Sequence, residues 1–342
     1  MIRRTKHAST ATCTLPIYMG FLMTEPNSIS CTQLAETYNI SHDSVNRFLE
    51  REDYTPHDLY QEAIQHIDNN KLIVSIDDTV LDKPYSQHMD LVSYFWSGKH
   101  HRSVKGINLI TLYATDQNGQ NIPINFRIYD KSEGKTKNDY FMDMLSEVLS
   151  WGAKIQFITG DSWYSSTGNL KTIRKYGIRF MFGIDCNRKV SPEKGQWFQL
   201  RLLPDFHQGQ VVWLKDFGFV QLFKTQLKEQ QRFYIVHQDE DDLLSFEGFH
   251  ELHSSHWKIE QYHRVIKQVC HIEKFQVRRS KLILNHIFSA LMAYVEIQKN
   301  QFEQIFENVY RWQKKLFRPI IKDFIDDFIL DKNHLLPQRI YK

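Results

Sequence analysis

Two short apolar segments, each ending in acidic residues, constrain the fold of this chain more than any other feature. Residues 71–82 read KLIVSIDDTVLD, and residues 154–161 read KIQFITGD. Short apolar runs of this length are typical of buried strands. Acids at the carboxyl ends of strands lie at the rim of a sheet, where α/β folds commonly build their sites. The sequence therefore predicts an α/β protein with a candidate carboxylate site.

The rest of the chain predicts strands and helices in alternation, interrupted once. An Asn-Gly pair at 118–119 indicates a hairpin between two strands. Residues 190–245 hold short β-like pieces and predict a β-rich insertion, after which 249–272 and most of 281–330 are expected to be helical. The other predicted elements are strands at 107–115, 121–130 and 178–185 and helices at 138–151 and 166–176.

Residues 30–50 have the spacing of a helix-turn-helix, in which the second helix enters a DNA major groove. Asn39 stands at the turn, where a positive φ is tolerated, and Ser41 can cap the second helix. A simple helical hairpin is the alternative. The residues expected to point outward, toward DNA, are Asp43, Ser44, Asn46 and Arg47.

Length and composition exclude several classes of protein. The 342 residues suffice for about two domains, and the net charge of +3 does not by itself indicate nucleic-acid binding. None of the four cysteines forms a C-x-x-C pair, so a cysteine zinc site is not expected. No signal peptide and no apolar window of about 18 residues is found, so we expect a soluble, cytoplasmic protein.

A third acid lies on the helix that reads HSSHWKIEQYHRVIK, at 253–267. At about 100° of rotation per residue, Glu260 shares a polar stripe with two histidines and a lysine. A solvent-exposed face with Glu260–Arg264 pairing is the alternative. The stripe consists of His253, His256, Glu260 and Lys267, with Trp257 and Arg264 beside it.

Three carboxylates brought together repel one another. At about 4 Å and an effective dielectric constant of about 20, each pair costs about 4 kcal/mol. A divalent cation removes this cost, and oxygen ligands favour Mg²⁺ or Mn²⁺. Two such ions can activate a water or a 3′-hydroxyl for attack on a phosphodiester. Neither a G-x-S-x-G motif nor a Walker A loop is present to support other chemistries.

These segments resemble the DDE transposases of bacterial insertion sequences, whose catalytic domain has an RNase H-like fold. One branch carries a β-rich insertion and a Y-x2-R-x3-E-x6-K motif on the helix of the last acid. Asp78 lies in IDDT, Asp161 in TGDSWY, and Glu260 in HWKIEQYHRVIK, which also contains the W-x-I-E core and the lysine of the motif. The resemblance covers about residues 71–280.

The resemblance implies a mixed sheet flanked by helices, with Asp78, Asp161 and Glu260 holding two Mg²⁺ ions, for which Mn²⁺ can substitute. Asp77 is the alternative first acid, since only one of two adjacent strand residues can point into the site. Asp78 is preferred because the family's acid directly precedes threonine, and Thr79 follows Asp78.

The resemblance further implies cleavage and strand transfer on double-stranded DNA, at terminal inverted repeats and at a target, by a homodimer in a synaptic complex at the bacterial nucleoid. His253 and His256 occupy the Tyr and Arg positions of the motif, which contact DNA, and Lys267 occupies the lysine position. A tryptophan of the insertion, Trp213 or Trp197, is a candidate to stack on a flipped base, although ordinary packing is the alternative.

Five regions are expected. They are a helical DNA-binding region at 1–68, the first part of the catalytic core at 69–189, the insertion at 190–246, the helix of the last acid at 247–285 and a C-terminal helical region at 286–342. Two other functions stay open: a catalytically silent, transposase-derived DNA-binding protein, and a transition-metal hydrolase. The hydrolase would use His253, His256, Glu260 and His263 as ligands.

Overall fold

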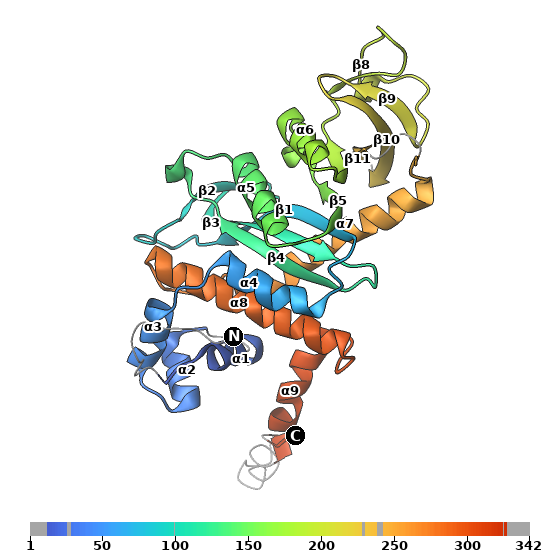
Figure 1. Ribbon diagram of the computed structural model, residues 1–342. Helices are drawn as coiled ribbons and strands as arrows, with labels where there is room; N and C mark the ends of the chain where they lie inside the picture. Colours follow the sequence, from blue (N-terminus) through green and yellow to red (C-terminus); the bar gives the residue numbers. More distant parts are fainter. Residues whose placement is uncertain are drawn as a thin grey trace, which may run out of the picture.

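The computed structural model shows a large mixed sheet flanked by helices (Figure 1). No helix in the described part of the chain is long and apolar enough to cross a membrane. The structure describes residues 12–25, 29–98, 100–227, 230–237, 242–323 and 325–326.

The core of the sheet is built around β1 (Leu72–Asp82). It pairs antiparallel with β3 (Arg102–Thr115) and parallel with β5 (Ile155–Gly160). The sheet continues antiparallel from β3 to β4 (Asn121–Ile128) and parallel from β5 to β6 (Arg179–Ile184). This order confirms the expected RNase H-like mixed sheet, with the apolar runs of β1 and β5 at its centre.

The hairpin predicted at the Asn-Gly pair joins β3 to β4. Gly119 has a φ of 79°, and Asp116 Oδ1 accepts hydrogen bonds from the backbone of Asn118 and Gln120, each at 2.9 Å. One strand was not predicted, the short edge strand β2 (Ser93–Ser97), which pairs with β3. Its five residues are too few to give a clear alternation.

The strands of the insertion continue the core sheet instead of forming a separate one. β11 pairs antiparallel with β6, and Ile235 lies opposite Phe182. The sheet therefore runs without a break from the core into the insertion, which lies at the upper right of Figure 1. The five strands are β7 (Lys189–Ser191), β8 (Phe198–Gln199), β9 (Gln210–Leu214), β10 (Gly218–Leu227) and β11 (Gln230–His237).

Three helices near the sheet matter for the site. α5 (Lys137–Ser150) begins with a capping box of Thr136 and Asp139, and it contacts β3 and β4. α7 (Phe246–Gln268) contacts β1 and β5. α6 (Thr167–Lys175) connects β5 to β6.

The N-terminal helices α1 (Leu15–Thr24), α2 (Cys31–Tyr38) and α3 (His42–Arg51) include the predicted helix-turn-helix pair, α2 and α3. Asn39 ends α2 with a φ of 51°, and the Ser41 hydroxyl accepts a hydrogen bond from the backbone of the first turn of α3. The turn and the cap therefore form as the sequence indicates.

One of the residues expected to point outward from α3 does not. Ser44 is buried, and its hydroxyl accepts hydrogen bonds from the backbone of Thr12 at 2.7 Å and of Cys13 at 3.0 Å. The segment before α1 covers this position, and its contact with α3 is too distant in sequence to be predicted locally.

α8 (Ser280–Phe302) joins the N-terminal helices to the sheet, because it contacts α1, α3, α4 (Pro56–Ala63) and β4. The boundary expected between 285 and 286 falls inside this helix. α9 (Val309–Asp323) follows, and residues 327–342 of the expected C-terminal region lie outside the described residues.

Candidate active site

The acids of β1 and β5 reach the same rim of the sheet because these strands are parallel. Ile76 pairs with Gly160, so Asp77 and Asp161 are the next residues on the two strands. Asp161 begins a short 3-10 turn, in which its Oδ1 accepts a hydrogen bond from the backbone N–H of Trp163 at 3.0 Å. The strand register thus brings two of the acids together.

Asp77 faces the helix that carries the third acid. It lies opposite Thr111 in the sheet, and the hydroxyl of Thr111 is 3.3 Å from that of Tyr262 on α7. Nδ1 of His263, on the same helix, is 3.6 Å from a carboxylate oxygen of Asp77. One ligand atom each of Asp77, Glu260 and His263 lies within 4.8 Å of the others.

Asp78 also lies near Asp161, but its carboxylate is held by hydrogen-bond donors. Its Oδ2 accepts hydrogen bonds from Lys137 Nζ at 2.7 Å and from Asn108 Nδ2 at 2.6 Å, and its Oδ1 accepts one from the Tyr164 hydroxyl at 2.9 Å. Lys137 is the first residue of α5, so Asp78 is bonded to α5, whereas Asp77 faces His263 of α7. Three donors already hold this carboxylate.

The structure thus places Asp77, not Asp78, in the group with Glu260 and His263, while the sequence-based choice of Asp78 as the first acid stays a prediction. Adjacent residues of a strand point to opposite faces, so only one of them can turn toward Glu260. The threonine that follows Asp78 gives no information about which face α7 covers. Strand alternation and the position of α7 together show which of the two side chains faces Glu260.

The charges at this rim are poorly compensated. Burial raises the pKa of Asp77 well above its usual value, and the negative charges of Asp161, Asp78 and Glu260 raise it further. The pKa of Asp161 is raised to about 6, mainly by burial among neighbouring atoms and then by the charge of Asp78. Carboxylates crowded in this way fit the ligand set of a hard divalent cation.

His263 also fits a role as a metal ligand. Its side chain is buried, and burial lowers its pKa to about 3, so the ring is neutral at physiological pH. Its Nε2 atom has no hydrogen-bond partner among the residues that the structure describes. The position was visible in the sequence three residues after Glu260, but its burial was not.

The two histidines of the polar stripe make contacts inside the protein. His253 Nε2 lies 3.0 Å from the Tyr234 hydroxyl, and His256 Nδ1 lies 3.1 Å from the Thr159 hydroxyl. Burial lowers the pKa of both, that of His256 to about 4, so both are uncharged at neutral pH. They do not gather with His263 into the histidine-rich metal site that was the third hypothesis.

The other residues expected to contact DNA differ in their exposure. Trp257 and Arg264 are exposed beside Glu260. Lys267 donates a hydrogen bond to the Val80 carbonyl at 2.7 Å, at the end of β1. Two exposed residues thus flank Glu260, while Lys267 is bonded to β1, the strand that carries Asp77 and Asp78.

On α3, Arg47 is exposed and lies 3.8 Å from Asp43, one turn earlier. Asn46 bonds to His42, and both line a cleft of about 330 Å³ that residues 275–278 close on the other side. The helix expected to read DNA therefore has two exposed positions, Asp43 and Arg47, and one position inside a cleft.

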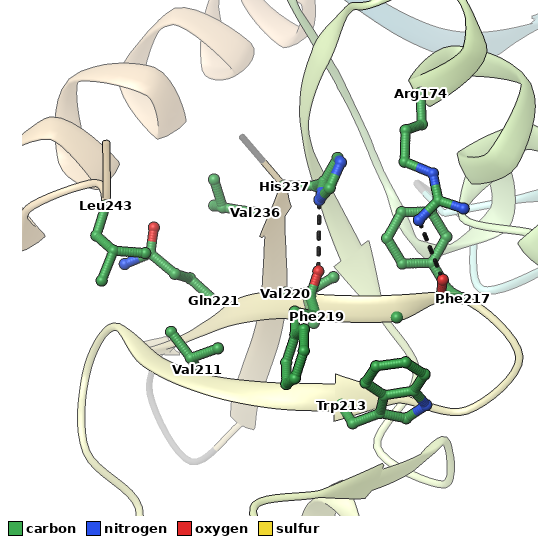
Figure 2. Close-up of a pocket in the computed structure, with 11 residues that line it drawn as sticks. Arg174, Val211, Trp213, Phe217, Phe219, Val220, Gln221, Val236, His237 and Leu243 are labelled. Atoms are coloured by element: carbon green, nitrogen blue, oxygen red, sulfur yellow. Dashed lines mark hydrogen bonds between the residues drawn. The ribbon is translucent and has the colours of Figure 1, made fainter. Parts of the chain in front are cut away.

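The insertion contains a larger pocket of about 700 Å³, which shares no residue with the acidic rim (Figure 2). Trp213 and Phe219 stand edge to face in it, with ring centroids 4.8 Å apart, and Arg174 of α6 donates to the Phe217 carbonyl at 3.2 Å. Trp197, the other tryptophan considered, is exposed but does not line this pocket.

Comparison with known families accounts for the acids at this rim. The model of the transposase DDE domain matches residues 68–295, which is more than half of the chain and includes Asp77, Asp78, Asp161 and Glu260. This chain belongs to the DDE transposase family. Transposases of this family use divalent metal ions, and the group of Asp77, Glu260 and His263 is compatible with one.

Two solved structures are similar to this transposase domain protein, both of Marinitoga piezophila Argonaute. The complex with 5′ OH guide RNA and target DNA has a TM-score of 0.22 and 9% identity, covering 71% of this chain and 32% of that one. The complex with guide RNA has a TM-score of 0.22 and 11% identity, covering 65% and 32%. This chain thus spans about a third of the Argonaute chains. None of the curated proteins compared with the sequence matches it.

Proposed function

We propose that this protein is the transposase of an insertion sequence, which binds the terminal inverted repeats of its element and catalyses metal-dependent DNA cleavage and strand transfer. One observation carries the proposal: in a chain of the DDE transposase family, β1, β5 and α7 each bring a carboxylate to one rim of the sheet. The three carboxylates are those of Asp77, Asp161 and Glu260.

In this proposal the three carboxylates hold two Mg²⁺ ions, for which Mn²⁺ can substitute. Bound there, two ions supply an activated water or 3′-hydroxyl and stabilise the leaving oxygen. Asp78 is retained as the second choice for the first acid. Its contacts with Lys137, Asn108 and Tyr164 suit it better to holding β1 and α5 in place.

The DNA contacts are divided between two regions in this proposal. Trp257 and Arg264 are exposed beside Glu260 and suit the DNA end at the site, where Arg264 can bind phosphate. Asn46 and Arg47 of α3 suit the terminal repeat. His253, His256 and Lys267, all engaged in internal contacts, would contact DNA only after rearrangement.

The family also favours a homodimer in a synaptic complex with two element ends and target DNA, acting at the nucleoid in the bacterial cytoplasm. A hairpin intermediate is compatible with the aromatic pocket of the insertion, where Trp213 could stack on a flipped base. These finer steps rest on the family and on the exposed aromatic surface of that pocket.

The test is a cleavage assay on a duplex that bears the terminal repeat of the element, with Mg²⁺ or Mn²⁺. We expect strand-specific nicks that disappear in Asp77→Asn, Asp161→Asn and Glu260→Gln. Asp185→Asn is the matched control, since Asp185 is an exposed acid after the neighbouring strand β6. Nicks that persist in all three variants would refute the proposal. Specific binding without cleavage in either metal would favour the catalytically silent DNA-binding protein.

A further inference from the structure

The side chain of His263 is an unexplained feature of the acidic rim. It is only 6% exposed, and its Nε2 atom has no hydrogen-bond partner among the described residues. The nitrogen that lies beside Asp77 is the other one, Nδ1, so the case for an ion rests on the position of Nδ1 among the carboxylates. His263 follows Glu260 by three positions on α7, so both side chains lie on the same face of the helix.

The distances around His263 fit a shared ion better than a hydrogen bond. Its Nδ1 is 3.6 Å from Asp77 Oδ2, which is longer than a good hydrogen bond. Two ligands that each lie about 2.0–2.1 Å from one ion are separated by about 3–4 Å. The ligand atoms of Asp77, Glu260 and His263 lie within 4.8 Å of one another, so small side-chain shifts suffice to close the set.

We propose that His263 is a nitrogen ligand of the ion held by Asp77 and Glu260, and that it makes the site prefer Mn²⁺ and similar transition-metal ions over Mg²⁺. The inference rests on the proposed function only in assigning a metal to these carboxylates. Mg²⁺ favours oxygen ligands, whereas imidazole suits transition metals. A Glu-x-x-His pair on a helix serves as a metal-binding unit in carboxylate helix bundles.

Two half-buried histidines of α7 do not compete for this role. His256 is directed to the Thr159 hydroxyl, and His253 to the Tyr234 hydroxyl. Neither belongs to the group of ligand atoms around Asp77. His256, one helical turn before Glu260, therefore provides a matched control for His263.

The experiment is electron spin-echo spectroscopy of the full chain loaded with Mn²⁺ in the absence of DNA. We expect nitrogen-14 modulation from one histidine in the unmodified protein and in His256→Gln, and its loss in His263→Gln. Titration should show a weaker Mn²⁺ affinity for His263→Gln. Loss of a residue that only hydrogen-bonds a metal ligand costs about 10–100-fold in affinity, and loss of a ligand itself should cost at least as much. The ratio of Mn²⁺ to Mg²⁺ affinity should fall as well.

Absence of nitrogen modulation in the unmodified protein, or its persistence in a folded His263→Gln, would overturn the inference and leave His263 a neighbour of Asp77 only. If His263→Gln does not fold, the spectra of His256→Gln and His253→Gln test the inference. Nitrogen modulation that is kept in both variants supports His263 as the ligand. Modulation that is lost in either variant refutes the inference. Nitrogen coupling without DNA cleavage would refute the proposed function alone, and cleavage with an all-oxygen site would refute this inference alone.

Discussion

Two adjacent acids of β1 have different partners, and this difference is the reason for proposing Asp77 as the metal ligand. Asp77 faces other carboxylates and a neutral histidine, and among the described residues no Lys or Arg forms an ion pair with it. Asp78 is held by the ammonium group of Lys137 and by two further donors. A metal at Asp78 would first have to displace these contacts, whereas a metal at Asp77 relieves repulsion.

Substitution of the two acids should therefore have different effects. We expect Asp77→Asn to weaken Mn²⁺ binding and to slow DNA nicking by more than about 100-fold, because a metal supplies several kcal/mol of charge stabilisation. Asp78→Asn should keep Mn²⁺ binding but lower the free energy of unfolding by about 1–3 kcal/mol, through its lost hydrogen bonds. Calorimetric titration and nicking rates distinguish them, and the reverse ranking would identify Asp78 as the first acid.

The raised pKa of Asp161 predicts a pH dependence. Its pKa in the folded protein is about 6, above the about 3.9 expected in the unfolded chain. Between these values the folded chain binds more protons, so the free energy of unfolding of the metal-free protein should fall as pH rises from about 4 to about 6. Thermal unfolding with a chelator should show this fall, reduced in Asp161→Asn. An identical slope in the variant would contradict the assignment, and Mn²⁺ should restore stability above about pH 6.

Among the elements, α7 connects the insertion to the acidic rim. Near its start, Phe249 stacks on Phe223 of β10 with ring centroids 4.5 Å apart, and His253 meets Tyr234 of β11. Two turns later, Glu260 stands beside β1. One rigid helix thus fixes the last acid relative to both parts of the sheet, so packing in the insertion bears on the geometry of the site.

The close packing of β5 at Gly160 gives a prediction for this part of the sheet. A Cβ atom at Gly160 would lie 2.6 Å from Phe182 and 2.7 Å from Ile76. Gly160→Ala should therefore lower the free energy of unfolding by about 1–3 kcal/mol and displace Asp161, the next residue. At Gly20 of α1 an added Cβ would have no atom within 4 Å, so Gly20→Ala should raise the free energy of unfolding by about 0.5–1 kcal/mol. Denaturant unfolding measures the free energy of unfolding of both variants. An unchanged value for Gly160→Ala would contradict the close packing of β5.

In the whole molecule, α8 holds the N-terminal helices against the core. Asn285 is fully buried, and its Nδ2 donates to the carbonyls of Leu49 at 2.7 Å and Glu52 at 2.6 Å. His286 Nδ1 lies 2.8 Å from the Tyr18 hydroxyl. Because one helix packs on both parts, we expect them to unfold together.

Asn285→Ala tests this connection. Loss of the amide removes both of these hydrogen bonds and the one that its Oδ1 accepts from the backbone of Tyr54, all in a buried position. Stability should therefore fall by at least about 2 kcal/mol, with α3 and the sheet still unfolding in one transition. Asn300→Ala, near the end of α8, removes contacts with Glu296 alone and should cost less. Two separate transitions by calorimetry in the unmodified protein would show that α8 does not couple the two parts.

The sequence alone determined the features that depend on local pattern. The apolar runs predicted β1 and β5, the Asn-Gly pair predicted the β3–β4 hairpin, and the polar stripe drew attention to the helix of Glu260. Each of these signals lies within a few residues, because strand and helix periodicity and turn chemistry are local properties of the chain.

Tertiary structure decided which side chains meet. Whether Asp77 or Asp78 lies near Glu260 depended on which face of β1 is covered by α7, about 180 residues later in the chain. The burial of His263 and of Ser44, and the pairing of β11 with β6, likewise depended on segments distant in sequence. A strand pattern predicts that neighbouring side chains alternate, but only packing determines which alternate set faces the metal site.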